Sequence, residues 1–135
     1  MAETRKILVV DDEQQLALAV KIRLQSKGYK VTNASTADEA LAAVRRERPH
    51  LVLLDVTIPG AQGLDVLRQI RQHDSGIGVI MITGNRDPAL VQATLELGAV
   101  NYLVKPFDID RLDRVVRWNL RLSAGVDRET EIAIK

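Results

Sequence analysis

The sequence predicts an α/β domain built on a doubly wound parallel sheet of five strands. Short apolar runs rich in β-branched residues alternate with longer segments of helical periodicity, which is the pattern of repeated βαβ units. The chain has 135 residues, of which 46% are hydrophobic, enough for one sizeable core and too few for two. Four of the runs end on polar side chains, as expected where the strands of an open sheet meet a binding crevice.

The predicted strands are the apolar runs at residues 7–10, 29–33, 51–54, 79–82 and 102–104. The first intervening helix is marked by Leu16, Val20 and Leu24 at helical spacing, and Gly28 is the expected left-handed cap at its end. The second helix should begin after Ser35 and Thr36, whose hydroxyls suit a cap, and Pro49 should close it.

Three further helices complete the pattern. A loop is predicted at residues 58–60, followed by a helix marked by Leu64, Leu67 and Ile70. The fourth helix spans about 88–97 and ends at Gly98, and the fifth spans about 108–122. Right-handed helical crossovers between consecutive parallel strands then give a (βα)5 sheet, and we expect the flavodoxin-like strand order 2-1-3-4-5.

Composition narrows the class of function. The chain carries 19 basic and 18 acidic side chains, and this near balance gives no electrostatic reason to expect direct binding to nucleic acid or to a membrane. There is no cysteine, the start lacks the apolar core of a secretory signal, and a cytoplasmic location is expected. We expect one domain over residues 1–122, with 123–135 as a C-terminal tail or linker stub.

Three carboxylates point to a metal site. Asp11 and Asp12 follow the first predicted strand and Asp55 follows the third, so they should meet at one edge of the sheet. Clustered carboxylates repel one another and are stabilised by a hard divalent cation, most simply Mg²⁺. Thr83 and Lys105 follow the fourth and fifth strands, where they could neutralise phosphoryl oxygens.

These observations favour phosphoryl transfer, with Asp55 as the nucleophile that forms an aspartyl phosphate. Taken singly, each residue has a simpler explanation, because an aspartate after a strand often caps a helix and a lysine is often a solvated charge. The shared placement of these residues at strand ends is what favours a site.

Over about residues 5–122 the chain resembles the receiver domains of two-component response regulators. The matching motifs are the acidic pair Asp11-Asp12, the phosphoacceptor Asp55 in LLDVTIPG, Thr83 in MITG, and Lys105-Pro106 in YLVKPF. The resemblance implies that Asp12, Asp55 and the backbone carbonyl of Thr57 bind Mg²⁺ directly, with Mn²⁺ as a substitute, and that Asp11 acts mostly through water. It also implies that Thr83 and Lys105 hold the phosphoryl oxygens.

The same resemblance implies a switch and its partners. Tyr102 matches the aromatic position that turns inward in relatives when the threonine moves toward the phosphate; an ordinary half-buried strand aromatic is the alternative. The signal would reach the face built by the fourth helix, the fifth strand and the fifth helix. The implied partners are a sensor histidine kinase or phosphotransfer protein and a downstream effector. A homodimer that forms on phosphorylation is a further alternative.

Other classes of function would need different residues at these positions. A haloacid-dehalogenase-type hydrolase needs a second acid two residues after its nucleophile, where this chain has Thr57. A flavodoxin-like cofactor binder needs a phosphate loop where this chain has an acidic run, which would repel a phosphate. A degenerate receiver acting as an unphosphorylated scaffold is the stronger alternative. Since the protein itself would be the substrate of a self-catalysed transfer, we do not class it as an enzyme.

Overall fold

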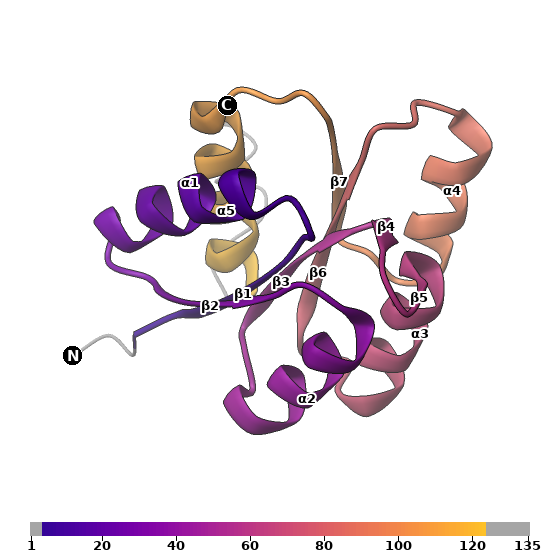
Figure 1. The fold of residues 1–135 in the computed structure, drawn as a ribbon, viewed down its shortest axis with the longest axis horizontal. Helices are drawn as coiled ribbons and strands as arrows, with labels where there is room; N and C mark the ends of the chain where they lie inside the picture. The colour runs from indigo at the N-terminus through magenta and orange to yellow at the C-terminus, as the bar shows by residue number, and fades with distance from the viewer. Residues whose placement is uncertain (1–3, 124–135) are drawn as a thin grey trace.

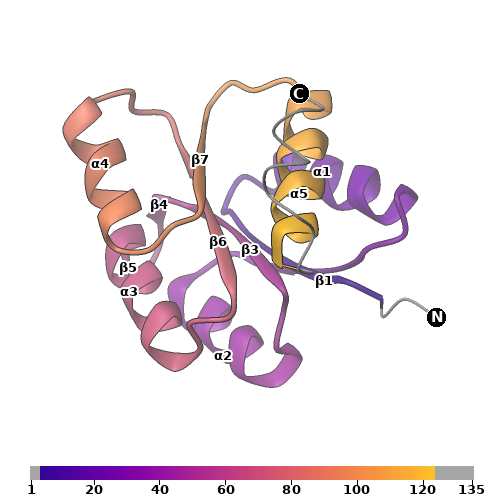
Figure 2. The ribbon, with the colours of Figure 1, turned by 180° about the vertical axis from the view of Figure 1, so that it is seen from behind.

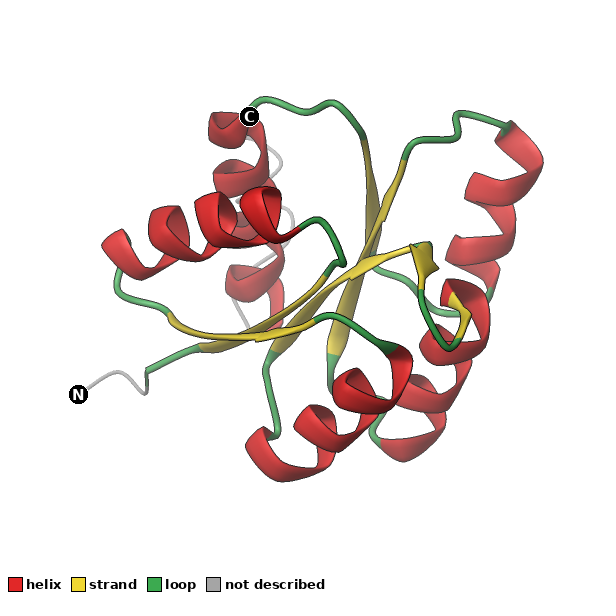
Figure 3. Ribbon diagram, viewed as in Figure 1, coloured by secondary structure: helices red, strands yellow, loops and turns green. Residues whose placement is uncertain are grey.

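The computed structural model describes residues 4–123, which form a five-stranded sheet with helices on both faces (Figures 1 and 3). The strands of this sheet are β1 (Lys6–Val10), β2 (Lys30–Ala34), β3 (Leu51–Asp55), β6 (Gly78–Thr83) and β7 (Asn101–Val104). They are hydrogen-bonded in the order β2-β1-β3-β6-β7, and every pairing is parallel. The predicted fold class and strand order are therefore confirmed.

The helices divide between the two faces of the sheet. Two of them, α1 (Gln14–Ser26) and α5 (Ile109–Ser123), cover one face, and α2 (Ala37–Glu47), α3 (Gly63–His73) and α4 (Pro88–Glu96) lie on the other (Figures 1 and 2). This arrangement explains why the central strands are apolar on both sides, because each of their faces is covered by helices. All five residues of β3 are buried.

The sheet separates two hydrophobic clusters. Leu51 and Leu53 of β3 pack with residues of α1 and α5, whereas Val52 and Leu54 pack with residues of α2 and α3. Side chains of a strand alternate between the two faces of a sheet, so neighbouring residues of one strand contribute to different clusters.

Several predicted helix ends are confirmed. Thr36 caps α2, since its side chain accepts a hydrogen bond from the Glu39 amide at 3.2 Å, and Glu39 accepts one from the Ser35 amide at 3.3 Å. The arrangement differs from a standard capping box in that the Glu39 carboxylate binds the amide of the residue before the N-cap and not that of the N-cap itself. Gly28 and Gly98, after α1 and α4, have φ of 93° and 101°, the left-handed conformation that favours glycine.

Two predictions need correction. The second strand was expected at 29–33 but begins at Lys30, because the Tyr29 amide donates to the Leu24 carbonyl and so belongs to the end of α1. A loop was expected at 58–60, but β4 (Thr57–Ile58) and β5 (Ala61–Gln62) form a small antiparallel hairpin there. Ile58 of this hairpin is buried in the α2–α3 cluster, which fixes the hairpin on the body of the domain.

Two expectations concern the chain ends and the membrane. The last helix reaches Ser123, one residue beyond the expected domain boundary, and the rest of the expected tail, 124–135, lies outside the described residues. Among residues 4–123, no helix has both the length and the apolar character needed to cross a membrane.

Candidate phosphoacceptor and metal site

Three carboxylates lie together at the carboxyl ends of β1 and β3. Each of Asp11, Asp12 and Asp55 offers one oxygen, and these atoms lie within 4.8 Å of one another. Asp11 and Asp55 are buried, and Asp12 is exposed. The predicted convergence is confirmed, and it follows from the parallel pairing of β1 with β3, which brings the ends of both strands to the same edge of the sheet.

The ammonium of Lys105 binds two of these carboxylates and one more. Its Nζ lies 2.8 Å from Asp55 Oδ2, 3.0 Å from Asp11 Oδ2 and 3.1 Å from Glu13 Oε1. Lys105 follows β7, which does not touch β1 or β3, so its long side chain spans the width of β6 to reach them. Sequence reasoning missed Glu13, and its position directly after the acidic pair is the signal that could have identified it.

The backbone holds the carboxylates in place. Asp55 Oδ1 accepts a hydrogen bond from the Thr57 amide at 2.9 Å, and Asp11 Oδ1 accepts one from the Glu13 amide at 2.9 Å. In both cases the second oxygen faces Lys105. Each buried carboxylate is thus fixed by one turn hydrogen bond and one ion pair, which orients it before any ligand arrives.

The charges of the site affect its ionisation. Burial raises the pKa of Asp11 above its ordinary value, and hydrogen bonds from the Glu13 amide and from Lys105 only partly offset this effect. Burial alone would lower the pKa of Lys105, but its hydrogen bonds to Asp55, Asp11 and Glu13 outweigh burial and hold that pKa above the ordinary lysine value. Lys105 therefore stays charged at neutral pH.

Replacing Asp11 with asparagine is expected to stabilise the metal-free protein at neutral pH, because burial penalises the charged carboxylate there. Because the folded pKa of Asp11 is raised, the stability linked to its protonation is fully present below its unfolded pKa and is lost as pH rises through its folded pKa. Asparagine does not titrate, so the advantage of the variant should shrink as the solution is acidified. Urea unfolding at several pH values measures this difference.

The matched control for that experiment is Asp38→Asn, which alters an exposed aspartate in the first turn of α2 and should bring no stabilisation at neutral pH. Excess Mg²⁺ should remove the advantage of Asp11→Asn, because a cation that binds the folded acidic cluster stabilises the unchanged protein more. A metal-free Asp11→Asn variant no more stable than the unchanged protein would contradict the expectation.

Thr83 ends β6 beside the carboxylates and starts a chain of turn hydrogen bonds. Its buried hydroxyl oxygen accepts a hydrogen bond from the Asn85 amide at 2.9 Å. The Asn85 side-chain oxygen accepts one from the Asp87 amide at 2.8 Å, and Asp87 caps α4 by accepting from the Ala89 amide at 2.9 Å. The threonine is therefore connected to the start of α4 through successive hydrogen bonds.

The other two predicted site residues differ in position. Thr57 lies in β4 directly beside Asp55, as its amide hydrogen bond to that carboxylate requires. Tyr102 lies on β7 with 36% of its surface exposed, so in this structure its side chain is on the surface and not turned inward. It lines a surface pocket together with Arg86 and Val91.

The donor set suits a hard divalent cation. Asp11, Asp12 and Asp55 present carboxylate oxygens. An excess of negative charge remains after Lys105 is counted, since its ammonium pairs with Asp11, Glu13 and Asp55, and Asp12 adds a fourth negative charge. Mg²⁺ prefers such oxygen ligands and keeps several of its waters, which suits a cluster on the surface end of a sheet. The residues therefore fit the predicted ion.

A cluster of this kind at the carboxyl edge of a doubly wound sheet defines a domain that takes part in phosphoryl transfer. The chain belongs to the family of response regulator receiver domains, whose model matches residues 7–117. Receiver domains accept phosphoryl groups in two-component signalling, bind Mg²⁺ at an acidic cluster, interact with histidine kinases and effectors, and are not classical enzymes.

Curated relatives agree with this assignment. The chain is 37% identical over 120 residues to sporulation initiation phosphotransferase F of Bacillus subtilis, covering 89% of this chain and 97% of that protein. It is 43% identical over 128 residues to the DNA-binding response regulator MtrA of Mycolicibacterium smegmatis, covering 95% of this chain but 55% of that protein. The chain thus spans nearly all of the first relative and about half of the second.

Solved structures share the fold. A CheY-like response regulator receiver domain protein from Methanospirillum hungatei superposes with a TM-score of 0.88 at 29% identity, covering 93% of this chain and all of that one, 100%. The receiver domain of NtrX from Brucella abortus gives a TM-score of 0.80 at 35% identity, covering 85% of this chain and 98% of that one.

Proposed function

We propose that Asp55 is the residue of this receiver domain that accepts the phosphoryl group. The observation that carries the proposal is the setting of its carboxylate. One oxygen is held by the Thr57 amide, and the other lies 2.8 Å from the ammonium of Lys105, beside two further aspartates. Asp11 is buried but follows β1, one strand away from the centre, and Asp12 is exposed, whereas Asp55 ends β3, the central strand of the sheet.

The proposed reaction transfers the phosphoryl group from a phosphohistidine of a sensor kinase or phosphotransfer protein. The Asp55 oxygen attacks phosphorus, the bond between phosphorus and the imidazole nitrogen breaks, and the departing nitrogen takes up a proton. Lys105 and the Thr83 hydroxyl would stabilise the charge on the transferred oxygens. Asp12, Asp55 and the carbonyl of Thr57 would hold Mg²⁺, with Asp11 acting through water, and the ion would neutralise further charge on the transferred oxygens; Mn²⁺ would serve as a substitute.

The product would be reset by hydrolysis. Water attacks phosphorus of the aspartyl phosphate, inorganic phosphate leaves, and the Asp55 carboxylate is regenerated. The same residues that promote transfer would promote this step, so the chain would catalyse its own dephosphorylation. We place the exchange in the cytoplasm and keep residues 1–122 as the functional domain, with 123–135 as a tail or linker.

The output of the switch would come from the face formed by α4, β7 and α5. Once Thr83 binds a phosphoryl oxygen, its hydrogen bond with Asn85 must compete with the new contact, and the start of α4 is tied to that bond. Tyr102 on β7 would then change its position, and the face would favour a downstream effector or a second copy of the chain. Among the relatives, MtrA is described as DNA-binding, but our proposal includes no direct nucleic-acid contact for this domain.

Intact mass after incubation with acetyl phosphate tests the proposal. We expect a gain of one phosphoryl group that requires Mg²⁺ and is lost when Asp55 is replaced by asparagine. Asp65→Asn is the matched control, because Asp65 is an exposed aspartate of α3 paired with Arg68, and its replacement should leave the adduct unchanged. An adduct that survives Asp55→Asn would disprove the assignment of Asp55.

A stable phosphoryl mimic separates rapid hydrolysis from an inert pocket. If neither acetyl phosphate nor beryllofluoride binds the unchanged protein, the scaffold that works without phosphorylation becomes the better explanation. Binding of beryllofluoride without a mass adduct would indicate a competent pocket whose acyl phosphate is short-lived.

A further inference from the structure

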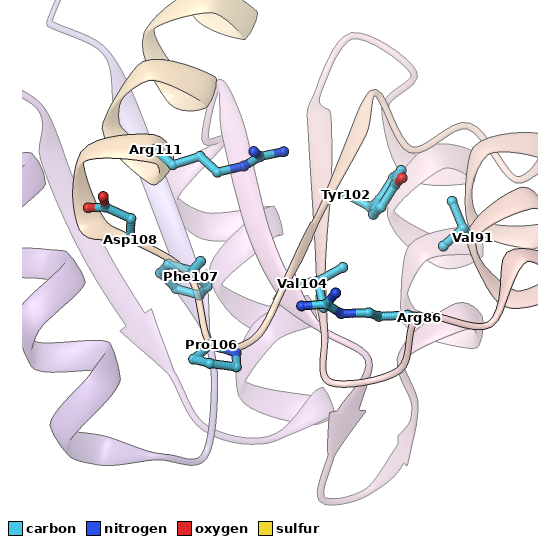
Figure 4. A pocket seen from close by; sticks show the side chains of 8 residues that line it. All are labelled: Arg86, Val91, Tyr102, Val104, Pro106, Phe107, Asp108 and Arg111. Carbon is cyan, nitrogen blue, oxygen red and sulfur yellow. The ribbon is translucent and has the colours of Figure 1, made fainter.

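A pocket of about 420 Å³ lies between the start of α4 and the start of α5 and extends over β7 (Figure 4). Its apolar part comes from Val91 of α4 and from Tyr102 and Val104 of β7. Arg86, in the loop before α4, extends across Val104, and Arg111 of α5 extends toward β7 from the opposite side. Two guanidinium groups thus reach the same space from separate segments of the chain.

These two guanidinium groups have no polar side-chain partner within the described part of the chain. Among residues 4–123, neither Arg86 nor Arg111 makes a hydrogen bond or an ion pair with another side chain. Asp108 is the acidic residue that lines the pocket, and it already accepts a hydrogen bond from the Asp110 amide at the start of α5. The pocket therefore combines an apolar surface with an excess of positive charge.

Arg86 is also connected to the proposed phosphorylation site. It lies between Asn85, whose amide donates to the Thr83 hydroxyl, and Asp87, whose amide donates to the Asn85 side chain. A phosphoryl oxygen that binds the Thr83 hydroxyl would compete with the hydrogen bond from the Asn85 amide. We therefore expect the backbone at Arg86 to shift. Arg111, on α5, has no such hydrogen-bonded connection and would stay in place.

We propose that this pocket binds an acidic segment of a partner protein, whose carboxylate is held between Arg86 and Arg111 while an adjacent apolar side chain packs on Tyr102 and Val104. Arginine forms paired hydrogen bonds to carboxylates, and two arginines beside an apolar surface select a peptide with both properties. The inference rests on the proposed function, because phosphorylation at Asp55 would set the position of Arg86 and hence the affinity for the segment.

Selection from a library of random short peptides tests the proposal. The target is the full chain saturated with beryllofluoride, and the probe for all later measurements is the tightest peptide selected. We expect the selected sequences to be enriched in aspartate or glutamate next to a large apolar residue. Fluorescence anisotropy should show that binding weakens when beryllofluoride is omitted and when the acidic residues of the peptide are changed to their amides.

Variants of the chain assign the binding to the pocket. Arg86→Gln and Arg111→Gln should each weaken binding about 10-fold, the usual loss for one charge-assisted contact. Arg114→Gln is the matched control, because Arg114 is an exposed arginine one turn further along α5 and does not line the pocket. The proposal would be overturned if Arg86→Gln and Arg111→Gln bound the peptide as tightly as the Arg114→Gln control, or if the selected peptides showed no enrichment in acidic residues.

Two controls separate this inference from the proposed function. The acetyl phosphate adduct is measured on every variant; a normal adduct with no acidic preference would reject the acidic partner and leave the role of Asp55 intact. If the unchanged protein neither formed the adduct nor bound beryllofluoride, the proposed function itself would be contradicted. If the beryllofluoride form occupies the pocket with a second copy of the chain, seen as an Arg86-dependent dimer that excludes the peptide, the proposal of an acidic partner segment is likewise rejected.

Discussion

Replacing Lys105 with methionine is expected to slow phosphorylation of the chain by acetyl phosphate by about 10²–10³-fold, the usual cost of removing one group that stabilises transition-state charge. The ammonium contacts Asp55 directly and is the cation that the structure places beside it. Because hydrogen bonds hold the pKa of Lys105 above its ordinary value, the ammonium is charged throughout the neutral range, and the loss should not depend on pH there. Time courses of intact mass measure the rate.

The same substitution should also destabilise the metal-free protein, by about 2 kcal/mol, because it leaves the buried carboxylates of Asp11 and Asp55 without their cation. Excess Mg²⁺ should recover part of this loss in urea unfolding, since a bound cation replaces the missing charge. Lys27→Met is the control: the half-exposed Lys27 pairs with Asp113 at 3.7 Å, and Arg23 also pairs with that carboxylate, so the loss of Lys27 should have little effect on rate or stability. A Lys105→Met variant that is phosphorylated at the normal rate would remove Lys105 from the proposed mechanism.

Replacing Gly63 with alanine is expected to destabilise the fold by about 3 kcal/mol, at the upper end of the cost of overpacking. A Cβ atom at this position would lie 2.6 Å from both the Cα and the carbonyl oxygen of Val56, and these are backbone atoms that cannot rotate away. The contact closes the β4–β5 hairpin, because the Gly63 amide donates to the Val56 carbonyl at 2.9 Å. Since Val56 directly follows Asp55, we also expect slower phosphorylation. Urea unfolding measures the loss of stability, and time courses of intact mass measure the rate of phosphorylation.

Two other glycines separate the causes. A Cβ at Gly84 would meet nothing within 4 Å, so Gly84→Ala should change stability little. Gly28 also has open space, but its φ of 93° is strained for alanine, and Gly28→Ala should cost about 1 kcal/mol. If Gly63→Ala proved no more destabilising than Gly28→Ala, close packing against Val56 would not be what requires glycine.

The sequence was sufficient to predict the sheet because its signals are local and repeated. Each apolar run is short, each is followed by a helix with its own start and stop residues, and the alternation leaves few topologies once crossovers are right-handed. The convergence of Asp11, Asp55 and Lys105 followed from that topology, because the ends of parallel strands meet at one edge. Three separate segments of the chain could thus be assigned to one site before any distance was known.

The features that sequence reasoning missed depend on tertiary contacts. The hairpin at 57–62 has strands of two residues each, which are too short for any alternation to be visible, and it is fixed by burial of Ile58 and by the contact of Gly63 with Val56. The ion pair of Glu13 with Lys105 joins residues 92 positions apart. Arg86 and Arg111 line the same pocket only because of how α4 and α5 lie beside β7.

The division of the core by the sheet has a consequence for how the sequence can change over evolution. Leu53 packs with the α1–α5 layer and Leu54 with the α2–α3 layer, although the two residues are neighbours in β3. Substitutions that repack one layer should leave the other nearly undisturbed, so free-energy changes from opposite faces should add. During evolution, the residues of one layer could therefore change while the other layer stays the same. The strand ends and their carboxylates border both layers and would be shared by all such variants.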